Sequence, residues 1–122
     1  MWDDEVLTGQ IIESIIRVHQ VLGPGFLESI YRRALVIELG RRGLEVQQEY
    51  EAPVFFEGQC VGNHRLDLVV ERRIILELKT IEGFNQAHYA QLRSYLKATG
   101  MRVGFLVNFA LTKADYRRVE LK

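Results

Sequence analysis

Hydrophobic residues recur at spacings of three and four along the first forty residues of the chain. The first run predicts an amphipathic helix over residues 6–22, which ends at the Gly-Pro-Gly sequence of residues 23–25. A second run predicts a helix from about Leu27 that stops at Gly40 or Gly43. Because two glycines lie in the link, the two helices can form a tight corner.

From residue 44 onward the hydrophobic period becomes two, which predicts β-strands. Pro53 breaks the first stretch and favours an edge strand, and residues 57–58 supply a turn before residues 59–62. Residues 64–70 and 74–79 predict a hairpin, although the link between them contains neither Gly nor Asn.

The last third of the chain predicts one more helix and one more strand. Asn85 can cap a helix over residues 86–98, whose predicted core-facing residues are Ala90, Leu92 and Leu96. The nearly continuous apolar run of residues 101–109 suits a buried strand, whereas residues 111–122 form a polar tail. The order of elements indicates an α/β fold in which helices pack on a mixed sheet.

The composition fits a single domain over residues 1–122. At 48% hydrophobic residues, a chain of this length buries roughly two-thirds of its unfolded surface, which suffices for a stable fold. Cys60 is the only cysteine, which excludes an intrachain disulfide and a cysteine-based metal site. The first residues are acidic and no apolar run could span a bilayer, so we expect a cytoplasmic protein without a membrane partner.

Charge is balanced, because sixteen Lys and Arg residues face sixteen Asp and Glu residues. The overall field that marks a non-specific nucleic-acid binder is therefore missing. Arginine can grip phosphate with two parallel hydrogen bonds, but paired arginines are slightly better explained as solvated surface. Four such pairs occur: Arg32-Arg33, Arg41-Arg42, Arg72-Arg73 and Arg117-Arg118.

The predicted hairpin carries a candidate reactive group. Glu77 and Lys79 share one face of their strand about 7 Å apart, and Asp67 on the partner strand can lie opposite or diagonal to Glu77. Two carboxylates at 4 Å repel by roughly 4 kcal/mol at an effective dielectric constant near 20. A divalent cation such as Mg²⁺ would relieve that repulsion, and Lys79 could orient a metal-bound water or stabilise charge on phosphorus.

Two further groups accompany the hairpin. Glu28 opens the second helix three residues before Tyr31, where a helix-dipole partner and a core residue are the plain explanations. On the third helix, His88, Gln91 and Tyr95 form a polar stripe that we expect to lie over the carboxylates. Each group alone has a plain structural explanation, which for the stripe and the hairpin residues is solvated surface, and their combination favours a functional site.

Together these residues resemble the GxxExxY family within the PD-(D/E)XK nuclease superfamily. Gly25-Phe26-Leu27-Glu28-Ser29-Ile30-Tyr31 matches the naming motif. Residues 65–70 and 77–79 match the nuclease core, and residues 88–96 and 104–109 are similar to the family's C-terminal half. The likeness covers roughly residues 7–110. Leu66 stands where the superfamily's name has proline.

The resemblance implies a restriction-endonuclease-like core with a mixed, mostly four-stranded β-sheet flanked by α-helices. It further implies that Asp67, Glu77 and the Leu78 carbonyl bind Mg²⁺ or Mn²⁺, that Lys79 serves the attacking water, and that Glu28 reaches the metal directly or through water. Gln91 and Tyr95 resemble the Gln-x-x-x-Tyr motif of RecB-type nucleases, which supports the metal cluster and the DNA strand. His88 and Tyr31 complete the candidate residues around the substrate.

The favoured hypothesis is a metal-dependent nuclease that hydrolyses phosphodiester bonds in DNA. A resolvase of four-way DNA junctions acting as a homodimer is one subtype. The alternative is a catalytically silent nucleic-acid-binding or protein-interaction module on a nuclease fold. The presence of every candidate residue favours the enzyme, because a silent module has no chemical reason to crowd acids together.

Overall fold

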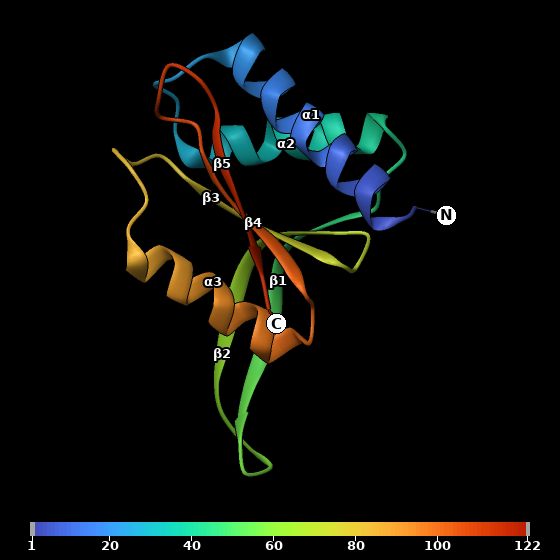
Figure 1. The fold of residues 1–122 in the computed structure, drawn as a ribbon, viewed down its shortest axis with the longest axis vertical. Helices are drawn as coiled ribbons and strands as arrows, with labels where there is room; N and C mark the ends of the chain where they lie inside the picture. Colours follow the sequence, from blue (N-terminus) through green and yellow to red (C-terminus); the bar gives the residue numbers. More distant parts are fainter. Residues whose placement is uncertain (1, 122) are drawn as a thin grey trace.

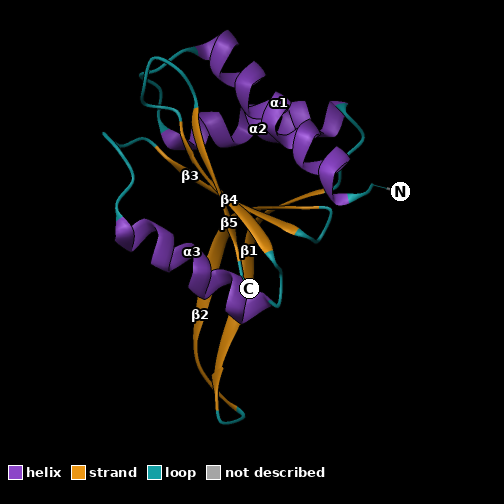
Figure 2. Cartoon of the chain, in the orientation of Figure 1, coloured by secondary structure: helices purple, strands orange, loops and turns teal. Residues whose placement is uncertain are grey.

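The computed structural model describes residues 2–121 as a mixed five-stranded sheet between two layers of helices (Figures 1 and 2). The elements are α1 (Asp4–Leu22), α2 (Glu28–Arg41), β1 (Val46–Phe56), β2 (Gln59–Val70), β3 (Ile74–Lys79), α3 (Gln86–Thr99), β4 (Val103–Asn108) and β5 (Asp115–Glu120). α1 and α2 cover one face of the sheet and α3 covers the other. The predicted mixed α/β fold is confirmed. Within residues 2–121, no helix has both the length and the apolar character needed to span a membrane.

The three predicted helices are present, and side chains cap two of them. The Asp3 carboxylate accepts the Val6 N–H at 2.9 Å at the start of α1, which ends where Gly23 takes a φ of 70°. Asn85 caps α3 as predicted, because its Oδ1 accepts the backbone N–H groups of Ala87 and His88.

The strands lie in the order β1-β2-β3-β4-β5, and only the β3–β4 pair is parallel. The prediction of a mostly four-stranded sheet is wrong by one strand, because the expected polar tail contains β5. Val119 is the one buried residue of β5, while Arg117 and Arg118 are exposed. An edge strand that rests on the core through so few residues shows no clear hydrophobic period in the sequence.

Pro53 lies in the edge strand β1, as predicted. The predicted interruption at Pro53 is wrong, because β1 continues to Phe56 and β2 runs without a gap from Gln59. An edge strand has one side without a partner, so a residue lacking an N–H can sit there without breaking the ladder.

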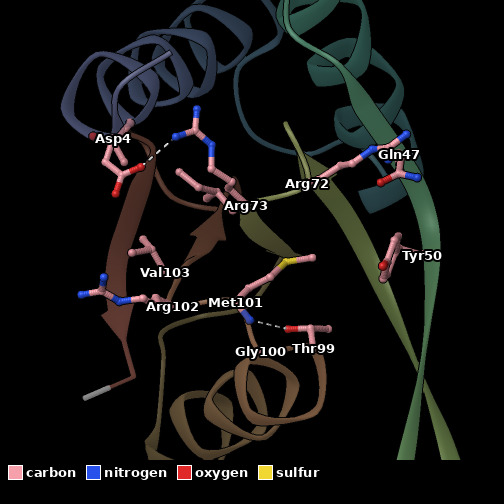
Figure 3. A pocket seen from close by; sticks show the side chains of 12 residues that line it. Asp4, Gln47, Tyr50, Arg72, Arg73, Thr99, Gly100, Met101, Arg102 and Val103 are labelled. Carbon is pink, nitrogen blue, oxygen red and sulfur yellow. Dashed lines mark hydrogen bonds and ion pairs between the residues drawn. The ribbon is translucent and has the colours of Figure 1, made fainter. Parts of the chain in front are cut away.

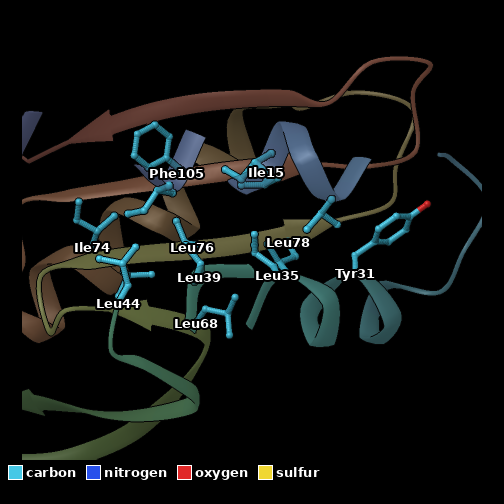
Figure 4. Close-up of a cluster of buried hydrophobic side chains, with 14 of the residues drawn as sticks. Ile15, Tyr31, Leu35, Leu39, Leu44, Leu68, Ile74, Leu76, Leu78 and Phe105 are labelled. Carbon is cyan, nitrogen blue, oxygen red and sulfur yellow. The ribbon is translucent and has the colours of Figure 1, made fainter. Parts of the chain in front are cut away.

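The strands separate two apolar clusters. The cluster beneath α1 and α2 contains Ile74, Leu76 and Leu78 of β3, together with Ile15, Tyr31, Leu35, Leu39 and Phe105 (Figure 4). The cluster beneath α3 contains Ile75, Leu92 and Leu96. This confirms the predicted alternation of faces along β3. Ala90 is exposed instead of facing the core, and Tyr95 is buried with Leu92 and Leu96.

The pleat of β2 is irregular at Asp67. Leu66 packs in the cluster beneath α3, whereas Leu68 packs in the cluster beneath α1 and α2. Residues two apart in a regular strand share a face, so β2 departs from a regular pleat between them. On the neighbouring strand β1, Glu49 lies between the paired positions Gln48 and Tyr50 and has a φ of 48°. The two irregular positions therefore face each other across the sheet.

The β2–β3 hairpin forms although its link lacks glycine. Glu71 and Arg72 take φ values of 53° and 55°, and the Val70 carbonyl accepts the Arg73 N–H at 3.0 Å. Two consecutive positive φ values are the geometry of a type I′ turn, which Gly and Asn adopt more readily than Glu and Arg. The Glu71 carboxylate also accepts the Glu45 N–H, so the strain is offset at Glu71 by a contact.

Replacing Arg72 with glycine should therefore stabilise the protein. Arg72→Gly removes the side chain from a left-handed backbone position and loses only an exposed ion pair with Glu45. We expect a gain of about 1 kcal/mol, or a rise in melting temperature of about 4 °C, in a thermal unfolding experiment. Arg118→Gly, in the extended strand β5, is the matched control and should destabilise. A loss of stability in Arg72→Gly would contradict the strain argument.

Candidate active site

Asp67 and Glu77 meet where the ladder between β2 and β3 stops. The last paired positions are Leu68 and Leu76, so Asp67 and Glu77 occupy the next facing positions. Beyond that pair, backbone N–H groups donate to side-chain carboxylates instead of to carbonyl groups of the neighbouring strand. The Asp67 N–H donates to Glu77 Oε1 at 3.0 Å, and the Leu78 N–H donates to Asp67 Oδ2 at 2.8 Å. Each carboxylate is thus fixed by the backbone of the opposite strand.

Burial perturbs both carboxyl groups, and the negative charge of Asp67 adds to its effect at Glu77. Glu77 is only 4% exposed, and burial, followed by the negative charge of Asp67, raises its pKa to about 8. Burial also raises the pKa of Asp67, although the Leu78 N–H and the positive charge of Lys79 act in the opposite direction. In the metal-free protein, burial therefore favours the protonated form of Glu77.

Glu28 joins this pair from the first turn of α2. Glu28 is an exposed residue, but partial desolvation, and then the charge of Asp67, raise the pKa of its carboxyl, while Lys79 and Arg32 act to lower it. Lys79 acts in the same direction on all three carboxyl groups. The structure therefore brings Glu28, Asp67, Glu77 and Lys79 into one electrostatic cluster, although Glu28 is some forty residues from the hairpin.

The three residues of the predicted polar stripe on α3, His88, Gln91 and Tyr95, lie in three different environments. Tyr95 is 7% exposed and contacts the ring of His64 edge-on, with 4.6 Å between ring centroids. Its pKa rises to about 12 because of burial and the charges of Glu77 and Asp67, so the phenol lies close to the acids. Gln91 is exposed one turn earlier. His88 Nδ1 accepts the Asn85 N–H at 3.0 Å, which closes the cap of α3.

Tyr31 lies in the core and secures the corner between α1 and α2. Its ring stacks on Phe109 at a centroid distance of 4.5 Å. Its hydroxyl donates to the Gly23 carbonyl and accepts the Phe26 N–H. Tyr31 therefore acts on the cluster only through the position of α2, which carries Glu28.

One residue beside the cluster, Arg32, was not identified as part of the site by the sequence analysis. Arg32, interpreted as one of several surface arginines, is only 24% exposed at its side chain and lowers the pKa of both Glu28 and Asp67. Its Nη2 lies 3.5 Å from Oε1 of Glu49. The spacing of four residues between Glu28 and Arg32 was the available sign, since it places both on one side of a helix.

The donor set suits a hard divalent cation. Asp67 and Glu77 offer carboxylate oxygens held in a crowded, partly buried position, which is the environment that a cation stabilises. Within residues 2–121, no group of three or more His, Cys, Asp or Glu side chains is arranged to hold a metal ion. Protein side chains alone would thus supply few ligands to an ion such as Mg²⁺, and water would complete its shell.

Comparison with known proteins decides the family. The sequence profile of the PD-(D/E)XK nuclease superfamily matches residues 5–119. The chain belongs to this superfamily. Enzymes of the superfamily generally use divalent metal ions, in agreement with the donor set around Asp67 and Glu77.

Solved structures share the fold of this superfamily member. An alkaline exonuclease (LHK-Exo) from Laribacter hongkongensis superposes with a TM-score of 0.56 at 13% identity, covering 100% of this chain and 73% of that one. The crystal structure of SSO0001 gives a TM-score of 0.54 at 14% identity, covering 90% of this chain and 65% of that one, just under two thirds. No curated protein sequence matched the chain.

A cavity of about 580 Å³ lies away from the acidic cluster (Figure 3). It opens between the start of α1 and the end of α3, and its lining includes Arg72, Arg73 and Arg102. Arg73 is paired with Asp4 at 3.0 Å and Arg72 with Glu45 at 3.2 Å. The cavity meets β3 at Ile74, the end of the strand opposite to Lys79.

The raised pKa of Glu77 predicts that the stability of the protein depends on pH. Its pKa rises on folding from an ordinary 4.5 to about 8, so the folded state binds the proton more tightly than the unfolded state. Stability in metal-free buffer should then fall as pH rises from about 5 to 8, by on the order of 3 kcal/mol. Urea unfolding at several pH values measures this.

Glu77→Gln should flatten that decline, because glutamine cannot ionise. Glu82→Gln, which changes an exposed carboxylate, is the control and should leave the decline unchanged. Parallel curves for Glu77→Gln and the unmodified protein would show that Glu77 does not hold the proton.

Proposed function

We propose that this protein is a metal-dependent nuclease of the GxxExxY family that hydrolyses phosphodiester bonds in DNA, with Mg²⁺ or Mn²⁺ as cofactor. The observation that carries the proposal is the pair of partly buried carboxylates, Asp67 and Glu77, held by backbone bonds next to Lys79. Placing two acids together in a sheet is costly for folding, and the cost has a chemical reason if the acids bind a cation.

Asp67, Glu77 and the Leu78 carbonyl would hold the cation, and Glu28 would bind it directly or through water. When bound, a divalent cation polarises the phosphate and makes its water more acidic. Lys79, whose charge already acts on all three acids, would orient the attacking water and stabilise charge on the phosphoryl oxygens. Tyr95 and Gln91 would support the cluster and the DNA strand from α3.

A cleavage assay tests the proposal. We expect cutting in a panel of single-stranded, duplex, flapped and four-way DNA with Mg²⁺ or Mn²⁺, and a loss of cutting in Asp67→Asn. Lys79→Met should lower the cleavage rate at least about 100-fold while metal and DNA binding stay nearly unchanged, because one positioned group is lost. Lys97→Met, an exposed lysine of α3, is the control and should cut normally.

The outcomes separate the enzyme from its alternative. DNA binding without cleavage of any substrate, with either metal, would favour a silent binding module on the nuclease fold. Loss of folding in Lys79→Met would make this lysine a packing residue. Cleavage confined to four-way DNA, together with a dimer in solution, would identify the junction-resolvase subtype.

Glu28 tests whether the site extends beyond the hairpin. Glu28→Gln keeps the size of the side chain but removes a charge that lies close to Asp67. We expect equal or higher stability in metal-free buffer, because repulsion falls, and strongly reduced cleavage with Mg²⁺. As a mere helix-dipole partner, Glu28 would instead contribute at most about 1 kcal/mol of stability and nothing to activity. Thermal unfolding and cleavage rates distinguish the two results.

A further inference from the structure

Arg32 lies beside the acidic cluster but is poorly bonded. Its side chain is 24% exposed, and its one ion pair within residues 2–121 joins Nη2 to Glu49 Oε1 at 3.5 Å. Its Nε is buried and has no hydrogen-bond acceptor. A buried donor without a partner is unfavourable, so the Arg32 Nε–H lacks a hydrogen bond that a bound acceptor could supply.

Arg42 provides a comparison within the same protein. Its side chain is 22% exposed, nearly the same as that of Arg32. Arg42 nevertheless donates to Glu38 at 3.0 Å, to Gln10 at 3.1 Å and to Glu13 at 3.4 Å. A partly buried arginine with a purely structural role is well bonded in this fold, and Arg32 differs from that pattern.

Glu49 holds Arg32 from a strained position. Its φ of 48° is left-handed, within a strand and across from Asp67, and such a conformation is unfavourable for a residue with a side chain. Its carboxylate lies between two guanidinium groups, 3.5 Å from Arg32 and 3.8 Å from Arg65. One anionic oxygen of Glu49 therefore already lies against the Arg32 guanidinium, while the other faces Arg65.

We propose that Arg32 binds the phosphate that is cut, and that Glu49 holds its guanidinium in place until the substrate arrives. The inference rests on the proposed nuclease function. A phosphate presents paired anionic oxygens like those of Glu49, and the planar guanidinium can bind two of them at once. Arg32 stands one helical turn after Glu28 on α2, and its partner Glu49 lies across from Asp67 in the β1–β2 pair, so the guanidinium lies next to the acids.

A simpler role would be that of a counter-charge to the acids. In that case Arg32 would matter for folding and for metal affinity in the absence of DNA, but not for the rate of cutting. A bound cation would take over this neutralisation, so Arg32 would be dispensable in the metal-loaded protein. The two roles therefore predict different behaviour at saturating metal.

The test compares Arg32→Ala with Arg33→Ala, the neighbouring exposed arginine of the same helix. At saturating Mg²⁺, Arg32→Ala should lower kcat/KM about 100-fold, with most of the loss in kcat, and Arg32→Lys should recover part of it. Added guanidinium ion, far below denaturing concentrations, should partly restore Arg32→Ala. Arg33→Ala should stay within about twofold of the unmodified rate.

A binding measurement keeps the test independent of catalysis. Fluorescence anisotropy with a labelled oligonucleotide, in the Lys79→Met background, gives the dependence of affinity on salt. Loss of one phosphate contact in Arg32→Ala should reduce the slope of log K against log salt by roughly 0.7–0.9. Glu49→Gln should bind DNA more tightly, and Arg32→Ala should abolish that gain, because the competing anion acts through Arg32.

The results distinguish failure of this inference from failure of the proposed function. If the unmodified protein cuts DNA and Arg32→Ala matches Arg33→Ala in rate and salt slope, Arg32 is only a counter-charge and the inference is wrong. If the unmodified protein neither cuts nor binds DNA, the nuclease proposal is wrong, and the inference about Arg32, which rests on it, is wrong as well. If it binds without cutting, the salt slope of Arg32→Ala still decides whether Arg32 contacts phosphate.

Discussion

The site depends on one feature of the β2–β3 pair: hydrogen bonds from backbone N–H groups to carboxylates take the place of the regular hydrogen bonds between the strands. Glu77 accepts the Asp67 N–H, and Asp67 accepts the Leu78 N–H, just beyond the last regular ladder pair. These hydrogen bonds fix the two acids while burial raises both pKa values and the charge of Asp67 raises that of Glu77 further. The shape of the site is therefore set by the fold, and a proton or a bound cation would balance its charge.

Both apolar layers hold this arrangement in place. α2 brings Glu28 and Arg32 to the acids from one face of the sheet, and α3 brings Tyr95 from the other. The fully buried Asn108 exchanges two hydrogen bonds with the backbone of Ile81, at 2.8 and 3.1 Å, and so fixes the loop that follows Lys79. Groups from distant parts of the chain can be held close together because each stands on a packed element.

The neutral composition of the chain hides an uneven distribution of charge. Arginines in the pairs at residues 72–73 and 117–118 have nearby acidic partners, and these pairs are largely at the surface. Arg32 instead lies next to a cluster of acids and is held by Glu49, whose backbone is strained. Net charge describes the field far from a protein, and it says little about one site where acids and an arginine lie together.

The sequence by itself determined the elements of this protein, because hydrophobic period, capping residues and turn residues act over a few neighbouring positions. The three helices, the hairpin and the grouping of Glu77 with Lys79 followed from such local patterns, and a motif joined Glu28 to them. Only the tertiary structure showed that Tyr95 is buried beside the acids, that His88 closes a helix cap, that residues 115–120 complete the sheet, and that Arg32 differs from the other arginines. These properties depend on what packs against each side chain from elsewhere in the chain, and burial and electrostatic interactions of that kind leave no periodic trace in the sequence.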